Sequence, residues 1–280
     1  MGPRMDALEK LERLRARLAE LESVLVCYSG GVDSAFVLAV AHEVLGARAV
    51  GMTAVSPSLP ELEREEAIGV ARALGADHRV VETRELDDPS YQKNDVDRCL
   101  HCKSELYRVA ASKQSEWGLA HVVNGTNVDD LGDYRPGLEA AQKALVVSPL
   151  VELGFTKADV RDAARAIGLA IWDKPAAACL SSRVPYGTSV TRELLARIGG
   201  FERVLRAELG FRQVRVRHHD TIARIELALE ELTRAIVPET REHIDRAGRE
   251  HGYRYVTLDL GGYRQGSHND VIVGRSLRVL

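Results

Sequence analysis

The segment Ser29-Gly30-Gly31-Val32-Asp33-Ser34 has the residue types of a phosphate-binding turn. It follows an apolar run at 24–28 and precedes a helical pattern at 35–45. In that position, backbone N–H groups and the helix dipole can receive phosphate oxygens. The two glycines let the backbone approach a ligand closely. The segment therefore predicts a nucleotide or pyrophosphate site.

The side chains of this turn add to the same chemistry. Ser29 and Ser34 offer hydroxyls to a pyrophosphate, Asp33 can hold a metal ion, and Asp33 and Ser34 can cap the helix. The chain lacks Gly-x-x-x-x-Gly-Lys-Ser/Thr and Gly-x-Gly-x-x-Gly at this place, which disfavours γ-phosphate transfer and dinucleotide binding. The turn instead resembles the Ser-Gly-Gly-x-Asp-Ser signature of the PP-loop ATP pyrophosphatases. That resemblance implies cleavage of ATP between its α- and β-phosphates.

A second polar segment, 124–130, follows a predicted strand and contains Asp129 and Asp130. Its acids should lie at the carboxyl edge of the sheet, where ligands bind in open α/β folds. They could hold Mg²⁺ or orient a substrate. Paired acids after a strand are also common in solvated turns, so both interpretations stay open on spacing alone.

Three cysteines are candidates for metal or sulfur chemistry. Cys99 and Cys102 form a Cys-x-x-Cys pair at the start of a helical pattern, and Cys179 lies far downstream in a loop rich in proline and alanine. The pair alone could be redox-active, zinc-binding or merely buried. Cys27 lies inside an apolar strand, which predicts a core residue.

Arginines mark a candidate anion site in the second half of the chain. Period-two alternation at 213–217 places Arg215 and Arg217 on one strand face, where two guanidinium groups could bind a nucleotide phosphate. Two arginines on a strand are more often a solvated face. Arg183, four residues after Cys179, is the better candidate for stabilising charge near a reaction.

Taken together, the motifs resemble one PP-loop subgroup, the LarE-type sulfur transferases that make the nickel-pincer nucleotide cofactor of lactate racemase. The resemblance spans nearly the whole chain. Its segments are Ser29 to Ser34, Arg98-Cys99-x-x-Cys102-Lys103, Gly125-Thr126-Asn127-x-Asp129-Asp130, Cys179-Leu180-Ser181-Ser182-Arg183-x-Pro185-Tyr186-Gly187, Arg215-x-Arg217 and Asp259-Leu260-Gly261-Gly262-Tyr263-Arg264. The resemblance implies adenylylation of the carboxylates of pyridinium-3,5-biscarboxylic acid mononucleotide and their conversion to thiocarboxylates.

The resemblance also implies cofactors and a sulfur source. ATP and Mg²⁺ belong to the adenylylation step. Some members of the family give up the sulfur of a single cysteine at the Cys179 position, whereas others hold a [4Fe-4S] cluster on three cysteines. The presence of Cys99, Cys102 and Cys179 favours the cluster, whose open iron could bind a hydrosulfide. Zinc on the same three cysteines is the structural alternative.

The elements that must position these residues alternate between helix and strand. Helices are expected at 6–22, 35–45, 59–74, 104–117 and 156–167, and strands at 24–28, 49–55, 78–81 and 121–124. Thr156 and Asp159 resemble a capping box at the last helix. This order predicts an α/β fold with a doubly wound parallel sheet, of the PP-loop (adenine nucleotide alpha hydrolase-like) type.

A second, smaller α+β domain is expected after the loop 173–189. A helix should begin at Thr191, and strands are expected at 213–217, 222–227 and 253–260. We therefore predict a PP-loop domain at 1–175 and a substrate-binding or oligomerisation domain at 176–280. Glu226 and Asp259 could support substrate or metal there.

The composition of the chain limits the kinds of partner that the protein is expected to bind. A net charge of −3 favours a small anionic nucleotide substrate over stable binding of nucleic acid. No apolar run is long enough to span a membrane, and four sparse cysteines do not form a disulfide scaffold, so a cytoplasmic protein is expected. The resemblance implies a homo-oligomer, such as a hexamer.

Three other functions remain open from the sequence. A tRNA thiolase could use the same loop and cluster, although no RNA-binding module is visible. An ammonia-transferring PP-loop synthetase would keep the ATP chemistry. A non-enzymatic nucleotide sensor with an iron-sulfur or zinc site is the third.

Overall fold

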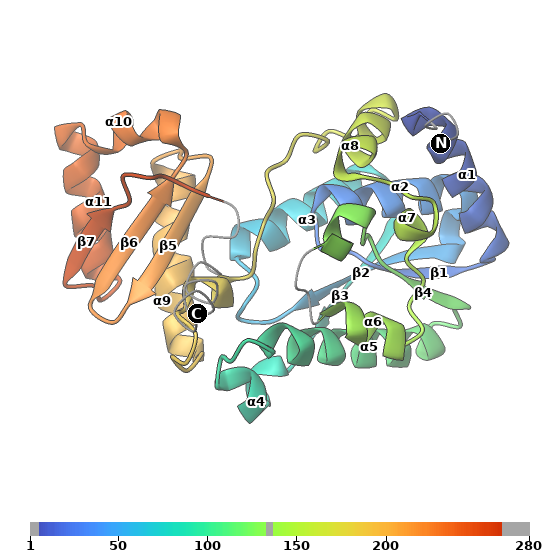
Figure 1. The fold of residues 1–280 in the computed structure, drawn as a ribbon, viewed down its shortest axis with the longest axis horizontal. Coiled ribbons are helices and arrows are strands. Elements are labelled where there is room, and N and C mark those ends of the chain that lie inside the picture. The colour runs from blue at the N-terminus through green and yellow to red at the C-terminus, as the bar shows by residue number, and fades with distance from the viewer. Residues whose placement is uncertain (1–5, 133–136, 265–280) are drawn as a thin grey trace, which may run out of the picture. The chain divides into compact units, whose positions relative to one another are not determined.

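The computed structural model describes residues 6–132 and 137–264, which form two units with a sheet in each (Figure 1). The first unit holds the chain up to Ser56, Leu62–Tyr91 and Val96–Ala177, and the second holds Pro57–Glu61, Gln92–Asp95 and the chain from Ala178. The change at 177/178 lies two residues beyond the predicted domain boundary. Two short segments of the first half also join the second unit, which sequence order did not indicate.

The first unit is built on a parallel sheet in the order β3-β2-β1-β4 (Figure 1). The strands are β1 (Val24–Cys27), β2 (Ala49–Val55), β3 (Asp77–Glu82) and β4 (His121–Val123). The chain moves outward from β1 to β3 and then returns to place β4 on the other side of β1. Ligands bind at such a reversal in open α/β sheets, at the carboxyl ends of the strands.

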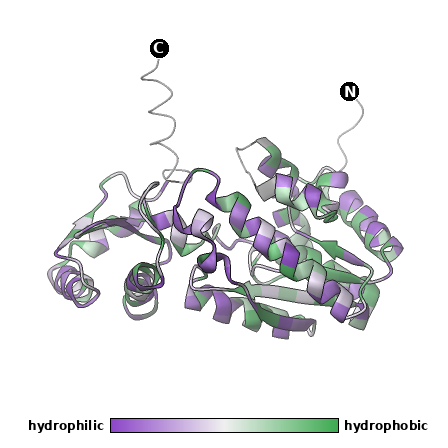
Figure 2. Cartoon of the chain, turned by 90° about the horizontal axis from the view of Figure 1, so that it is seen from below, coloured by the Kyte–Doolittle hydropathy of each residue, from purple (hydrophilic) through white to green (hydrophobic). Residues whose placement is uncertain are grey.

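Helices cover both faces of this sheet (Figure 1). Val24 and Val26 face the core under α1, α2, α3 and α8, whereas Leu25 packs against Val109 and Ala110 of α5. Most of these helices alternate hydrophilic and hydrophobic residues along their length (Figure 2). The predicted doubly wound α/β fold is therefore confirmed. The helices before residue 178 are α1 (Ala7–Glu20), α2 (Val32–Leu45), α3 (Glu61–Ala73), α4 (Pro89–Gln92), α5 (Arg98–Glu116), α6 (Gly137–Lys143), α7 (Pro149–Glu152) and α8 (Lys157–Ala166).

Local sequence explains where the flanking helices begin. Asp6 caps α1 by accepting hydrogen bonds from backbone N–H groups, and Glu9 completes a capping box. Thr156 and Asp159 form the predicted capping box of α8. Helix α2 is apolar around most of its circumference, because it lies buried against the sheet and between neighbouring helices.

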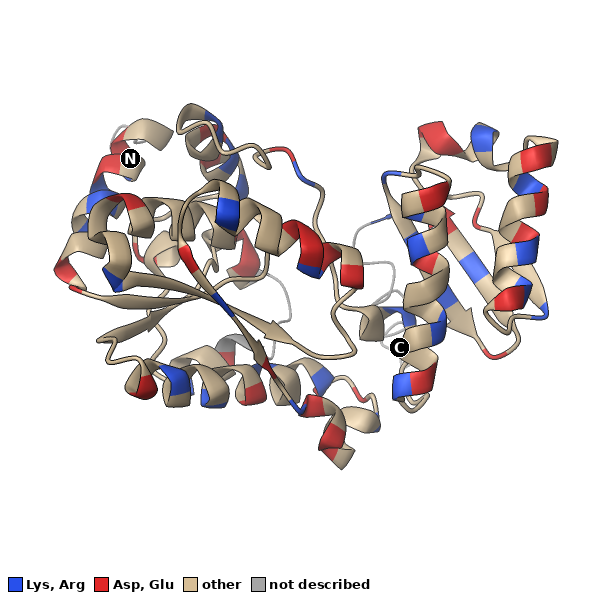
Figure 3. Cartoon of the chain, turned by 180° about the vertical axis from the view of Figure 1, so that it is seen from behind, with Lys and Arg blue, Asp and Glu red and all other residues tan. Residues whose placement is uncertain are grey.

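The second unit carries a three-stranded sheet in the order β5-β6-β7, with β5 and β6 antiparallel and β6 and β7 parallel. Val214 and Val216 lie in the core, and the alternation along β5 places Arg215 and Arg217 on the opposite face, where Arg217 pairs in register with Arg224 of β6. The basic residues along these strands are blue in Figure 3. Gly248 of α11 lies close to Val256 of β7, so α11 packs on the apolar face. The elements are α9 (Arg192–Arg203), β5 (Val214–His219), β6 (Ile222–Leu227), α10 (Leu232–Ala235), α11 (Pro238–Glu250) and β7 (Tyr255–Leu258).

The predicted strands all occur, with ends shifted by at most two residues. The largest difference is at α5, which begins at Arg98 rather than at 104, so both Cys99 and Cys102 lie within the helix. The short helices α4, α6 and α7 were not predicted, because segments this short carry little periodic signal. No helix in the described ranges has the length and apolar content that crossing a membrane requires.

The packing of α1 gives a test of this architecture. Leu14 is fully buried in the first core, whereas Leu8 on the same helix is 55% exposed. We expect Leu14→Ala to lower the free energy of unfolding by about 2–5 kcal/mol, because a buried cavity remains. Leu8→Ala should change it by less than about 0.5 kcal/mol. Equal midpoints for the two variants in chemical denaturation would contradict this packing.

Candidate nucleotide and sulfur-transfer site

The turn Ser29–Ser34 connects β1 to α2 at the centre of the first sheet. Its helix N-cap is Gly31, which makes no side-chain capping bond, so the expectation that Asp33 and Ser34 cap the helix is wrong. Both residues lie within the first turn of α2. Ser34 Oγ instead accepts from the Ser29 N–H at 3.1 Å and donates to the Gly31 carbonyl at 3.1 Å. The hydroxyl closes the turn on itself and leaves the helix N-terminus accessible to an anion.

At two positions of the first unit, atoms of a neighbouring segment lie so close to the backbone that only glycine fits. Gly30 has φ +76°, and a Cβ there would lie 2.6 Å from the Cβ of Ala67 on α3. A Cβ on Gly125, in the loop after β4, would lie 2.6 Å from the backbone nitrogen of Ser34. Only hydrogen fits at both positions. The loop after β4 therefore packs directly on the phosphate-binding turn.

An ion pair from α8 reaches the turn. The Lys157 ammonium pairs with Asp33 Oδ2, and the Lys157 backbone N–H donates to Asp129 Oδ2 at 2.7 Å. The side chains of Lys157 and Asp33 are 38% and 18% exposed. Asp33 Oδ1 is buried and has no hydrogen-bond partner within the described residues. This chain of contacts brings the two acids that the sequence singled out, Asp33 and Asp129, to one lysine.

The loop after β4 is held by its own side chains. Asn127 is fully buried. Its side-chain Oδ1 accepts the Asp129 backbone N–H at 3.0 Å, and its backbone N–H donates to Asp130 Oδ2 at 3.2 Å. One carboxylate oxygen of Asp129 and one of Asp130 thus accept a hydrogen bond from a backbone N–H group. Asn127 Nδ2 is a buried donor that no described residue accepts. Buried polar groups normally find a partner, so this amide is a candidate ligand contact.

A second lysine supports the turn from the segment before residue 178. Lys174 donates to the Gly30 carbonyl at 3.2 Å and pairs with Glu63 and Glu66 of α3, each at 2.8 Å. Burial of Lys174 opposes its charged form, but the hydrogen bonds that its ammonium donates to the two carboxylates outweigh this effect and raise its pKa. Lys174 therefore stays charged and ties the turn to α3.

Cys99 and Cys102 lie at the start of α5, three residues apart, so they share one face of the helix. Cys99 is exposed and Cys102 is half-buried. Cys27, at the end of β1, packs against the apolar cluster of Tyr107, Ala140 and Ala141, and burial raises the pKa of its thiol to about 12. Cys27 is therefore a protonated packing residue at neutral pH.

Cys179 belongs to the second unit and precedes the short helical turn Leu180–Arg183. The two segments from the first half of the chain hold this region: Leu180 N–H donates to the Ser58 carbonyl at 2.8 Å, and Asn94 Nδ2 donates to Pro185 and Thr188 carbonyls at 2.8 and 2.9 Å. The described residues contain no group of three metal-ligating side chains. Cys99 and Cys102 belong to the first unit and Cys179 to the second.

Arg183 holds the Cys179 loop. Its guanidinium makes a bidentate pair with Glu202 of α9, at 2.8 and 3.0 Å, and donates to the Cys179 carbonyl at 3.0 Å. Glu202 Oε1 also accepts the Val216 N–H of β5 at 2.8 Å. The geometry supports a positioning role for Arg183, because its charge is compensated by a buried carboxylate.

The predicted arginine face adjoins the same loop. Arg217 forms a bidentate pair with Glu226, at 3.0 and 2.9 Å, and donates to the Ser182 carbonyl at 2.8 Å. The guanidinium carbon of Arg215 lies 5.2 Å from the centroid of the Tyr263 ring, which belongs to the predicted segment 259–264. Both arginines are buried rather than solvated, at 8% and 7% exposure.

Burial and nearby positive charge both disfavour the charged form of Arg215. Burial, followed by the nearby charge of Arg183, lowers the pKa of Arg215. Glu226 also pairs with Arg224 at 3.0 Å, and Arg224 contacts Asp259. These two acids, whose roles the sequence left open, organise the arginines. A bound anion would relieve the repulsion between Arg183 and Arg215.

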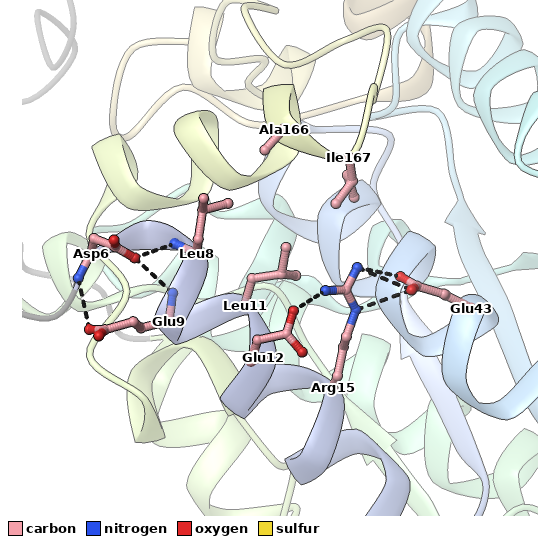
Figure 4. Close-up of a pocket in the computed structure, with 9 residues that line it drawn as sticks. All are labelled: Asp6, Leu8, Glu9, Leu11, Glu12, Arg15, Glu43, Ala166 and Ile167. Carbon is pink, nitrogen blue, oxygen red and sulfur yellow. Dashed lines mark hydrogen bonds and ion pairs between the residues drawn. The ribbon is translucent and has the colours of Figure 1, made fainter.

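A separate groove of about 660 Å³ lies along α1, away from the phosphate-binding turn (Figure 4). Leu8, Leu11 and Ile167 contribute apolar surface, and Arg15 in its wall pairs with Glu12 and Glu43 (Figure 4). Because two carboxylates surround that arginine, the groove has no spare positive charge for a phosphate.

Several site residues escaped sequence reasoning. Lys157, Lys174 and Glu202 look like ordinary surface charges in the sequence, since their partners lie 19 to 144 residues away. The sequence named Gly125 only as part of the Gly125-Thr126-Asn127 segment of the family resemblance, and its close approach to Ser34 was not predicted.

Gly125→Ala tests the close approach. Its Cβ would meet backbone atoms of Asp33 and Ser34, which cannot rotate away. We expect a loss of about 1–3 kcal/mol in stability, measured by denaturant unfolding, together with weaker phosphate binding. Gly69→Ala on α3 is the control, because nothing lies within 4 Å of its added methyl group; it should stabilise by roughly 0.5–1 kcal/mol. An unchanged midpoint for Gly125→Ala would show that the loop is not packed on the turn.

Comparisons with known proteins cover nearly the whole chain. An uncharacterised protein of Synechocystis is 45% identical over 263 residues, which are 94% of this chain and 98% of that protein. The pyridinium-3,5-bisthiocarboxylic acid mononucleotide synthase of Lactiplantibacillus plantarum is 39% identical over 269 residues, 96% of each chain. An uncharacterised protein of Methanocaldococcus jannaschii is 27% identical over 263 residues. No family model matches the chain.

The similarity to the Lactiplantibacillus plantarum enzyme includes both units, since it leaves out only a few residues of either chain. It agrees with the family that the motifs of the sequence indicated. The chain therefore belongs to the family of pyridinium-3,5-bisthiocarboxylic acid mononucleotide synthases, the LarE-type proteins.

Proposed function

We propose that the protein is an ATP-dependent sulfur transferase that converts the carboxylates of pyridinium-3,5-biscarboxylic acid mononucleotide to thiocarboxylates. The observation that carries the proposal is the phosphate-binding turn at the switch point of the first sheet, in a chain 39% identical over its length to a synthase of the bisthiocarboxylic acid. The substrate is a small nucleotide, and ATP activates it.

The first step is adenylylation. A substrate carboxylate oxygen attacks the α-phosphorus of ATP, the bond from that phosphorus to the bridging oxygen breaks, and pyrophosphate leaves with the electron pair. The product is an acyl-adenylate. N–H groups at the start of α2 and the hydroxyls of Ser29 and Ser34 are suited to bind the departing pyrophosphate.

Mg²⁺ fits the acids of this turn. Such an ion is commonly held by one or two protein carboxylates together with substrate phosphates and water. Asp33 supplies a buried carboxylate oxygen that lacks a partner among the described residues, and Asp129 is the second candidate. When bound, the ion would neutralise negative charge on the leaving pyrophosphate.

The second step is sulfur transfer. Hydrosulfide attacks the acyl carbon, the bond from that carbon to the AMP oxygen breaks, and AMP leaves as the thiocarboxylate forms and a proton is lost. We assign Cys99, Cys102 and Cys179 as ligands of a [4Fe-4S] cluster; none of the three is in a disulfide. Such a cluster would supply one open iron that can hold hydrosulfide. Arg183 fixes the Cys179 carbonyl and so orients that thiol.

The second unit is the proposed substrate-binding unit. Arg215 and Arg217 lie beside the Cys179 loop, and a nucleotide phosphate there would offset the repulsion that lowers the pKa of Arg215. We further propose, from the family resemblance, that the protein acts as a homo-oligomer.

The adenylylation step can be tested directly with Asp33→Asn. Wild type should release AMP and pyrophosphate only when the biscarboxylic acid mononucleotide is present, and mass spectrometry should detect sulfur in the product. We expect the variant to lose at least about 100-fold in AMP release, because the turn loses its metal-binding charge. AMP release that depends on tRNA, or an amide product with ammonia, would replace the proposed function by one of its rivals.

The sulfur source is tested by iron, zinc and acid-labile sulfide per chain after anaerobic purification. Near-stoichiometric iron and sulfide are expected in wild type and should be lost in Cys99→Ala. Cys27→Ala is the matched control and should keep both, since that thiol is a packing residue. Zinc, or no metal, in the wild type would contradict the cluster and leave Cys179 as a single-use sulfur donor.

A further inference from the structure

Asn94 combines two unusual features. Its backbone has φ +58°, in the left-handed region, and its side chain is fully buried. Asparagine adopts this conformation more readily than most non-glycine residues, but a buried amide requires hydrogen-bond partners. Asn94 belongs to Gln92–Asp95, a short segment from the first half of the chain that is part of the second unit. The contacts of its amide account for this placement.

The Asn94 amide binds one loop of the second unit, residues 184–188. Its Nδ2 donates to the carbonyls of Pro185 and Thr188 at 2.8 and 2.9 Å, and to the Val184 carbonyl at 3.4 Å. The Asn94 carbonyl also accepts a backbone N–H of this loop at 3.1 Å. Because Asn94 and Val184 are both fully buried, water is a poor substitute for the lost donor if the amide is removed.

A short series of hydrogen bonds connects this loop to Cys179. The Val184 N–H donates to the Ser181 carbonyl at 3.2 Å, and the Ser182 N–H donates to the Cys179 carbonyl at 3.1 Å. The Ser182 hydroxyl donates to the same carbonyl at 2.8 Å. Holding the chain at Val184 therefore restricts the backbone at Cys179, and Asn94 provides the hold.

The other contacts that hold this region lie nearer to Cys179. The Leu180 N–H donates to the Ser58 carbonyl at 2.8 Å, and the Arg183 guanidinium donates to the Cys179 carbonyl at 3.0 Å. Neither contact involves Asn94, so both remain when its amide is removed. We therefore expect the loop to stay attached to the second unit but to shift at its far end, where buried carbonyls would lack a donor.

We propose that Asn94 is a positioning residue for sulfur transfer, which holds the loop after Cys179 so that the Cys179 thiol keeps the orientation that the second step requires. The inference rests on the proposed function only in taking Cys179 as a residue of that step. Asn94 acts through the loop, because its side chain is buried against loop carbonyls. A shift of about 1 Å in a reacting group can slow a reaction roughly 100-fold, so such an anchor is sufficient to control the rate.

The reactivity of the Cys179 thiol tests the anchor without ATP or substrate. Asn94→Gly removes the amide and keeps a residue that adopts a positive φ without strain. Reduced, metal-free protein is alkylated with iodoacetamide, and mass spectrometry follows the peptide that contains Cys179. We expect its alkylation to become at least about fivefold faster, because local opening of a loop exposes its side chains. Cys99, in the first unit, is the internal reference and should react at its wild-type rate.

The two chemical steps distinguish positioning from a general loss of structure. In a single turnover with saturating substrate, Asn94→Gly should release pyrophosphate within about twofold of the wild-type rate, while thiocarboxylate forms roughly 10- to 100-fold more slowly. Equal slowing of both steps would overturn the proposal, because Asn94 would then support only the fold. Asn94→Asp should give the same separation of the two steps, since it replaces the donor by an acceptor of similar size.

Ile244→Val is the matched control for stability. Ile244 is a buried residue of α11, and the substitution removes one methylene group from the second unit. It should lower the thermal midpoint, as Asn94→Gly does, but leave the alkylation of Cys179 and the formation of thiocarboxylate unchanged. Wild-type alkylation of Cys179 in Asn94→Gly, or equally fast alkylation in Ile244→Val, would overturn the proposal. The alkylation needs no substrate, so failure of the thiocarboxylate assay and failure of this proposal are distinguishable.

Discussion

The close approach between Gly125 and the backbone of Ser34 is the constraint on which the candidate site depends. It presses the loop after β4 onto the first turn of α2, across the point where the strand order reverses. The segment that carries Asn127, Asp129 and Asp130 begins beside the turn, because nothing larger than hydrogen separates Gly125 from Ser34. The same contact explains why a polar loop containing a buried asparagine is stable there, since its own side chains hold its backbone.

The cations of the candidate site fall into two groups according to their carboxylate partners. Some cations are held by carboxylates, most of them buried: Lys174 by Glu63 and the more exposed Glu66, Arg183 by Glu202, and Arg217 by Glu226. Such pairs fix geometry but leave little net charge for a ligand. Lys157 has a more exposed side chain and a carboxylate partner that is itself part of the turn. This difference leaves the Lys157 side chain more accessible to solvent than the other three cations.

The division into units places the chemistry in two parts. The first unit carries the nucleotide turn and the Cys99–Cys102 pair, and the second carries Cys179 on a loop beside the arginine face. Ser58 and Asn94, from the first half of the chain, hold the Cys179 loop in the second unit.

The sequence by itself determined the fold class, the order of strands and helices, the phosphate-binding turn and the family. These follow from local patterns: period-two and period-3.6 apolar repeats, glycines after a strand, and short motifs of fixed spacing. Only the tertiary structure decided that Gly31 rather than Asp33 or Ser34 caps α2, that Arg215 and Arg217 are buried, and that Lys157 meets Asp33. Such contacts join residues up to 144 positions apart. The spacing of residues along the chain does not predict which charges come together, because that depends on how the helices pack.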